Sequence, residues 1–259
     1  MNATALGTWS RPPLAYVVAE LVISPYYSLA SKVPGLQDRL RTTFPKTIEA
    51  QEIVVDGAKP AQPLWHLVSA DQKHGIQLGT RSISLHATSY SNSRDLLTKW
   101  ADVLDAIQEA NLGAFVERAG LRYVDLIVPT GDRSPADYLA KQLQGVTPDG
   151  GRPTGSMWAA AFQFDGAIVN LRAGAPAPPG LLLPPNFNAM PLNKPQVMVD
   201  AEKRLKEEKA IGFIDTDCLR DVNQVFDAAK LVGIYADMQK LTSRTFKAAL
   251  SDVANKEWV

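Results

Sequence analysis

The chain has 259 residues, of which 46% are hydrophobic and 21% charged, and this composition is typical of a globular protein with one large domain or two small ones. Its 27 basic side chains are balanced by 27 acidic ones, and zero net charge disfavours nucleic acid as a partner, because phosphate neutralisation dominates such binding. A single cysteine, Cys218, excludes an internal disulfide and is typical of a reducing compartment.

No apolar stretch reaches the roughly 18 to 20 residues that a membrane-spanning helix needs. The longest stretch, residues 14–23, is interrupted by Glu20 and followed by Pro25. Residues 1–10 also lack the basic region and apolar block of a secretory signal. We therefore expect a cytoplasmic protein without a membrane partner.

The first half of the chain predicts four strands. Residues 14–23 are almost continuously apolar and β-branched, which indicates a strand buried inside a sheet. Residues 53–55, 64–68 and 76–88 follow as further strands. The apolar alternation of the last one changes phase at Gly79, and a β-bulge is the simplest explanation.

Two helices are interspersed among these strands. Leu36, Leu40 and Phe44 recur at intervals of four, which predicts a short helix with one buried stripe. A longer helix is expected between Asn92, a capping residue, and Gly113. Its buried face would consist of Leu96, Trp100, Val103, Leu104 and Ile107.

The second half predicts the same order of elements. Residues 115–128 read as a long strand, and residues 134–145 begin with the Ser-Pro-Ala-Asp pattern of a helix start. Asp165-Gly166 predicts a hairpin between strands, and a closing helical region follows a short last strand. The expected ranges of these later elements are 157–164 and 167–171 for the hairpin, 211–214 for the strand, and 221–256 for the helical region.

The predicted fold class is therefore α+β, with two successive β-α-β-β-β-α units whose antiparallel sheets are covered by helices. The halves are residues 1–113 and 114–259. Because the element order repeats, an internal duplication within one compact body is a further hypothesis.

A proline-rich arm over residues 173–196 interrupts the second half. Proline fixes φ and removes a hydrogen-bond donor, so the arm should be an extended loop. One interpretation is an ordinary hairpin extension. The other is an arm that grips a protein partner through its apolar residues Leu181, Leu182, Leu183 and Phe187. The charged residues 200–209 that follow predict a solvated helical turn or loop.

Asp215 and Asp217 give the best metal-like signal. Alternate residues of a strand point the same way, so their carboxylates could hold Mg²⁺ beside a phosphate. The alternative is a pair of solvated or helix-capping acids. We predict no cofactor.

Arg122 and Asp125 form a second candidate pair, either structural or facing a ligand. Asp125 shares the parity of Tyr123 and Ile127 in an apolar strand, so it should be partly buried and need a partner.

Motifs for catalysis are absent from the sequence. There is no Gly-x-Ser-x-Gly, phosphate-binding glycine loop or zinc-ligand spacing. His66, His74 and His86 are scattered, which favours hydrogen-bonded structural histidines, and Cys218 is expected to be a buried apolar residue. Aromatic residues in strands could stack bases but are more typical of a core; these are Tyr16, Trp65, Tyr90, Tyr123 and Trp158.

Three segments resemble a sporadically distributed bacterial family of proteins of about this length, whose function has not been established. They are residues 11–20 (RPPLAYVVAE), 120–127 (GLRYVDLI) and 246–258. Members usually carry an Asn-Arg pair where Asp125 and Leu126 stand here, and the resemblance implies no catalytic residues.

These observations favour a non-enzymatic interaction protein, an accessory, regulatory or neutralising subunit that binds another protein. The alternative is a nucleotide or nucleic-acid sensor, or a metal-dependent phosphoryl-transfer enzyme that uses Asp215 and Asp217.

Overall fold

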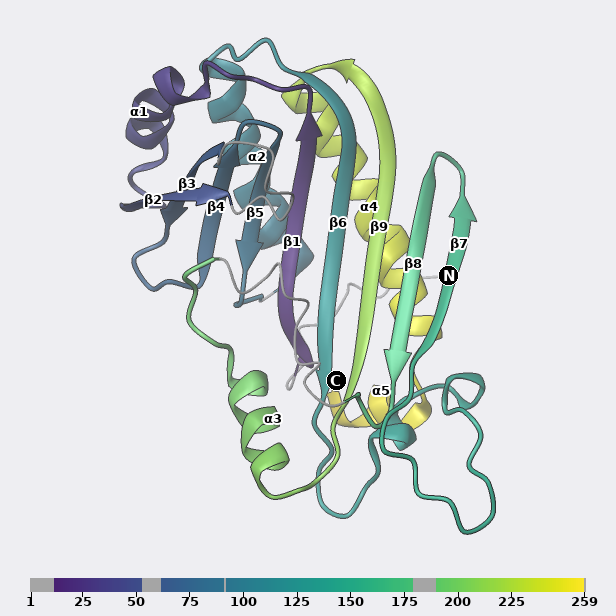
Figure 1. The fold of residues 1–259 in the computed structure, drawn as a ribbon. Coiled ribbons are helices and arrows are strands. Elements are labelled where there is room, and N and C mark those ends of the chain that lie inside the picture. The colour runs from purple at the N-terminus through teal and green to yellow at the C-terminus, as the bar shows by residue number, and fades with distance from the viewer. Residues whose placement is uncertain (1–11, 53–61, 91, 179–189, 259) are drawn as a thin grey trace.

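The computed structural model describes residues 12–52, 62–90, 92–178 and 190–258. Two predictions lie outside the described residues. They are the strand at residues 53–55 and the partner contacts of the proline-rich arm through Leu181 to Leu183 and Phe187. The described part confirms the α+β class, because helices pack against one nine-stranded antiparallel sheet (Figure 1).

The strands run in the spatial order β2-β3-β4-β5-β1-β6-β9-β8-β7. Their bounds are β1 Leu14–Ile23, β2 Lys46–Glu52, β3 Gln62–Val68, β4 His74–Gly79, β5 Ser82–Ala87, β6 Phe115–Ile127, β7 Trp158–Phe164, β8 Ala167–Gly174 and β9 Gly212–Val225. The helices are α1 Leu29–Leu40, α2 Ser93–Glu109, α3 Gln196–Lys206, α4 Ala228–Ala248 and α5 Asp252–Trp258, with short 3-10 helices at Pro135–Tyr138 and Lys141–Leu143.

The two expected halves meet along the central pair β1 and β6, so they share one continuous sheet in place of separate sheets. On one side of this pair the order is β1-β5-β4-β3-β2, and on the other it is β6-β9-β8-β7. Apart from the additional edge strand β2, the two halves use the same relative strand order, while internal duplication stays a prediction.

The bulge expected at Gly79 is wrong. The chain reverses there, and β4 and β5 form a hairpin in which Leu78 lies opposite Ile83. Thr80 and Arg81 form the connection between the strands. The apolar residues change from even to odd numbers because of this two-residue connection. Each residue of β4 lies opposite a residue of β5 whose number has the other parity, as Leu78 and Ile83 show, so one face of the sheet carries even numbers on β4 and odd numbers on β5.

The last strand is longer than expected. The sequence predicts helix for residues 221–225, but they complete β9 by pairing with the start of β6, where Phe115 lies opposite Val225. The long strand β6 supplies hydrogen-bond partners along the whole of β9, and this tertiary pairing overrides the weak local signal. The expected C-terminal helical region is confirmed only from Ala228 onward, as α4 and α5.

Two other helical predictions need correction. The capping box at Ser134 is present, but the segment forms two 3-10 turns and no regular helix. Its backbone bonds the end of α4 instead, with the Ala140 N–H donating to the Ala249 carbonyl at 2.8 Å. Much of the charged segment 200–209 belongs to α3, which buries Met198 and Ala201.

One face of the sheet carries α2 and α4, which pack side by side (Figure 1). Trp100 of α2 meets Tyr235 of α4 edge to face, with ring centroids 5.4 Å apart, and both side chains are fully buried. The opposite face, which we call the open face, is covered at one end by α3 through contacts with Leu126 and Phe213. Among the described helices, none combines the length and apolarity of a membrane-crossing segment.

Candidate ligand-binding cavity

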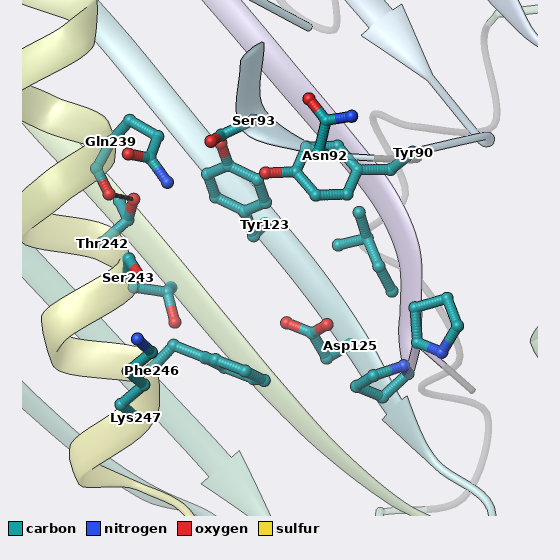
Figure 2. Close-up of a pocket in the computed structure, with 14 residues that line it drawn as sticks. Tyr90, Asn92, Ser93, Tyr123, Asp125, Gln239, Thr242, Ser243, Phe246 and Lys247 are labelled. Carbon is teal, nitrogen blue, oxygen red and sulfur yellow. Dashed lines mark hydrogen bonds between the residues drawn. The ribbon is translucent and has the colours of Figure 1, made fainter. Parts of the chain in front are cut away.

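A cavity of about 130 Å³ lies between the sheet and the C-terminal half of α4. The side chains that line it converge from the starts of β1 and α2, from β6 and β9, and from α4 (Figure 2). They are Pro12, Pro13, Leu14, Tyr90, Asn92, Ser93, Tyr123, Asp125, Thr216, Gln239, Thr242, Ser243, Phe246 and Lys247.

The strand register explains why an acid faces this cavity. Asp125 and Tyr123 lie on the same face of β6, because alternate residues of a strand share a face. In β1 the register shifts between Leu14, opposite Asp125, and Tyr16, opposite Val124, so Ala15 forms a bulge. This bulge keeps Leu14 on the cavity side of the sheet next to Asp125.

Asp125 is the most unusual group in the cavity. Its side chain is only 5% exposed, and Figure 2 shows the carboxyl group directed into the space beneath α4. Among the described residues, no hydrogen bond or ion pair reaches this carboxyl. A buried acid normally has such a partner, because removing a charge from water is costly.

This environment changes the ionisation of Asp125. Burial raises the pKa of the Asp125 carboxyl well above its ordinary value, and the nearby negative charge of Asp215 raises it further. Both effects disfavour the charged form. These surroundings therefore favour a neutral carboxyl group at Asp125.

Aromatic rings form two walls of the cavity. Tyr90 and Tyr123 contact edge to face with ring centroids 5.8 Å apart. Phe246 lines the cavity from α4 and stacks on Trp258, with ring centroids 6.5 Å apart. The three lining rings come from separate elements, so the site exists only in the folded chain.

Besides Asn92 and Ser93 at the start of α2, polar groups line the cavity from β9 and α4. Thr216 lies opposite Tyr123 in the sheet, and its buried hydroxyl has no hydrogen-bond partner among the described residues. Thr242 donates to the Gln239 carbonyl at 2.9 Å, within α4. Lys247 is exposed at the rim. A ligand in the cavity would find an unpaired acid and an unpaired hydroxyl.

Asn92 holds the start of α2 at the cavity wall, because its side chain accepts a hydrogen bond from the Asp95 backbone N–H at 3.0 Å. Replacing Asn92 by alanine should lower the free energy of unfolding by about 1 kcal/mol, the usual value of an N-cap. Urea unfolding of Asn92→Ala and of Asn92→Ser, which keeps a capping oxygen, measures this. Equal losses in both variants would contradict the capping role.

Arg122 and Asp125 do not form the pair expected from the sequence. They are three residues apart in β6 and so point to opposite faces of the sheet. Arg122 lies on the open face, where its guanidinium donates to both Asp215 oxygens at 2.8 and 2.7 Å. Arg172 reaches the same carboxylate at 3.0 Å, so two arginines share one acid that is 5% exposed.

Asp215 and Asp217, the two acids of the metal hypothesis, both lie on the open face beside these arginines. The oxygens of Asp215 are occupied by guanidinium donors, which is the geometry of an ion-pair network. Burial raises the pKa of the Asp217 carboxyl, and Arg122 opposes that shift. The described residues contain no group of three or more acids, histidines or cysteines arranged to hold a metal. This arrangement gives the metal hypothesis no support.

The structure confirms a hydrogen-bonded structural role for His86. Its Nδ1 lies 3.0 Å from the Tyr16 hydroxyl and its Nε2 lies 2.7 Å from the Ser84 hydroxyl. All three residues are buried, and burial lowers the pKa of His86 to about 3, so the ring is neutral. Cys218 is buried as expected, and burial raises the pKa of its thiol to about 12.

Sequence reasoning found Asp125 but missed most of its surroundings. Thr216 lies between Asp215 and Asp217 in β9. Because successive residues of a strand point to opposite faces, Thr216 faces the cavity while the two acids face the open side. On α4 the spacing of Gln239, Thr242 and Ser243 is a usable signal, because i, i+3 and i+4 place three polar residues together within an otherwise apolar stripe.

Comparisons of this chain with protein-family models, with curated proteins and with solved structures give no match.

Proposed function

We propose that this protein is a binding protein that takes a small ligand, or a small group of a larger one, into the cavity beneath α4. The unpaired, buried carboxyl of Asp125 is the observation that supports this proposal most strongly. A buried polar group without a partner costs about 1 to 3 kcal/mol of stability. A ligand that completes the site recovers that free energy, which makes an unpaired group facing a cavity typical of binding sites.

Binding is favoured over catalysis by the way the lining residues are arranged. The titratable side chains around the cavity are Tyr90, Tyr123, Asp125 and Lys247. Asp125 makes no hydrogen bond to a nucleophile or to a second acid among the described residues. General acid–base and covalent catalysis both rely on such a connected pair.

A cavity-filling variant tests the proposal. Ser243→Phe places a ring in the cavity, whereas Lys240→Phe adds the same ring to the exposed side of α4. Ligand-observed NMR with small ammonium ions, carboxylates and neutral alcohols should detect at least one class of probe bound to the unmodified protein. That binding should persist in Lys240→Phe and disappear in Ser243→Phe. If no probe class binds, or if Ser243→Phe binds equally well, the proposal fails.

Protein binding, the function expected from the sequence, is a second candidate, and the edge strand β7 supports it. Among the described strands β7 pairs only with β8, and it carries no charged side chain. Phe162 is 38% exposed there. Native sheets usually protect such edges with charges, as β2 does with Lys46 and Glu49. We propose that an extended segment of a partner protein adds to β7 as a further strand.

A photo-crosslinking residue at Ala161 of β7 should capture this partner, and the same residue at Glu49 of β2 should not. Phe162→Lys should abolish the crosslink while the free energy of unfolding changes by less than about 0.5 kcal/mol, as is usual for exposed positions. Equal capture at both edges would contradict the proposal. Deletion of residues 175–191 tests separately whether the proline-rich arm contributes.

A further inference from the structure

We infer that the cavity ligand is a small organic ammonium ion, held by the Asp125 carboxylate between the rings of Tyr90, Tyr123 and Phe246. This inference rests on the proposed function, because it names the chemical class of the ligand in that same cavity.

The charges around the cavity favour a cationic ligand. Asp125 is the one carboxyl group among the described lining residues, and the one lining cation, Lys247, is exposed at the rim. Across the sheet, Arg122 and Arg172 are already paired with Asp215. Within the described part of the chain, Asp125 therefore has no cationic partner, and a buried carboxylate is stabilised when an opposite charge lies within a few ångströms. An ammonium ion supplies that charge.

The aromatic walls of the cavity also favour a cation. Aromatic faces attract cations through the negative potential above each ring, and the attraction strengthens where water is excluded. Tyr90, Tyr123 and Phe246 line the cavity around Asp125 from the segment before α2, from β6 and from α4 (Figure 2). An acid combined with several rings is the composition that recognises alkylated ammonium groups.

The volume of the cavity suits a compact head group. An apolar cavity of about 150 Å³ is known to hold benzene. The present cavity of about 130 Å³ therefore has room for a compact head group such as trimethylammonium, with the rest of the ligand extending past the rim. The unpaired Thr216 hydroxyl offers an additional acceptor to a primary or secondary ammonium group.

One other ligand chemistry fits an acid in this environment. A neutral carboxyl could instead donate a hydrogen bond to a carbonyl or carboxylate of the ligand. Asp125→Asn separates the two cases, because asparagine keeps a hydrogen-bond donor but cannot become negatively charged. Ammonium binding requires the charge, whereas recognition by a donor does not.

Calorimetry with the full chain provides the test. The probes are choline, its neutral isostere 3,3-dimethyl-1-butanol, and acetate. Choline should bind at least tenfold more tightly than either other probe. Asp125→Asn should weaken choline binding at least tenfold, and Phe246→Leu should weaken it less. Asp149→Asn, the same change at an exposed loop position, should leave binding unaltered.

Proton release gives an independent readout. Choline binding should release a proton from Asp125, visible as a dependence of the binding heat on the ionisation enthalpy of the buffer. The other titratable groups around the cavity are Tyr90, Tyr123 and Lys247, and Asp215 lies across the sheet. Loss of the proton release in Asp125→Asn assigns it to Asp125, and its persistence there would contradict the inference.

The outcomes distinguish the inference from the proposed function. If acetate or the neutral alcohol binds more tightly than choline, or if Asp125→Asn binds choline unchanged, the ammonium inference is wrong and the cavity remains a binding site. If none of the three probes binds and the broader NMR panel also shows no binding, both fail. Far-ultraviolet circular dichroism of each variant verifies that it is folded.

Discussion

Replacing Asp215 by alanine should lower the free energy of unfolding by about 3 to 5 kcal/mol, because it leaves a buried cation without its partner. Arg122 donates two hydrogen bonds to this carboxylate, and its side chain is 15% exposed. Arg172 provides a third contact from β8. The three side chains connect β6, β9 and β8 on the open face, so the loss affects the packing of the sheet at its centre.

The double variant Arg122→Met with Asp215→Leu provides the control. It removes the more buried cation together with the acid and leaves only Arg172, whose side chain is 39% exposed, so this variant should lose less stability than Asp215→Ala alone. Urea unfolding at neutral pH measures all three proteins. The effect should change little between low and high salt, because buried charges are poorly screened. A loss below about 1 kcal/mol in Asp215→Ala would show that the network behaves like a surface ion pair.

Asp125→Asn should raise the free energy of unfolding at pH 8 by about 1 kcal/mol or more, because asparagine cannot ionise and so removes the proton linkage that favours the unfolded chain. Burial raises the pKa of Asp125 in the folded chain well above the value of an unfolded aspartate. The unfolded state therefore loses this proton at a lower pH than the folded state does. As the pH rises above about 4, the ordinary aspartate pKa, ionisation stabilises the unfolded chain and the folded protein becomes less stable.

This coupling of ionisation to folding predicts the pH range in which unmodified protein and Asp125→Asn differ in their free energy of unfolding. Below about pH 4 the carboxyl is protonated in both states, and unmodified protein and Asp125→Asn should have similar stability. The difference should grow with pH until the folded carboxyl ionises as well. Thermal or urea unfolding across this range measures it, with Asp149→Asn as the exposed control. A variant that is less stable at pH 8 would indicate that Asp125 is charged and paired in the folded protein. An ammonium ligand should reduce the difference, because it stabilises only the aspartate form.

Several elements could be predicted from local patterns. The stripe that contains Trp100 and Ile107 gave α2 and its cap at Asn92, and the run of residues 14–23 gave β1 with the observed bounds. The parity of Asp125 with Tyr123 correctly placed the acid on a buried face. The same two-residue period also separates Arg122 from Asp125, and strict use of it would have ruled out that pair.

Other features depended on contacts between distant segments. Residues 221–225 became strand because Phe115 and Val116 pair with them from more than a hundred positions away. Arg122 pairs with Asp215 because of the antiparallel register of β6 and β9. This register places Val124 opposite Asp215, and Arg122, two residues from Val124 on the same face, reaches the carboxylate with its long side chain. No local pattern specifies such a register.

The sequence alone therefore determined the α+β class, most strands and helices, and the burial of Asp125, because hydrophobic periodicity acts within a few turns of chain. Only the tertiary structure decided that the halves share one sheet, that Asp215 belongs to the arginines, and that α4 closes a cavity over Asp125. Those outcomes follow from strand register and helix packing, which are set by the combined burial of residues far apart in the chain.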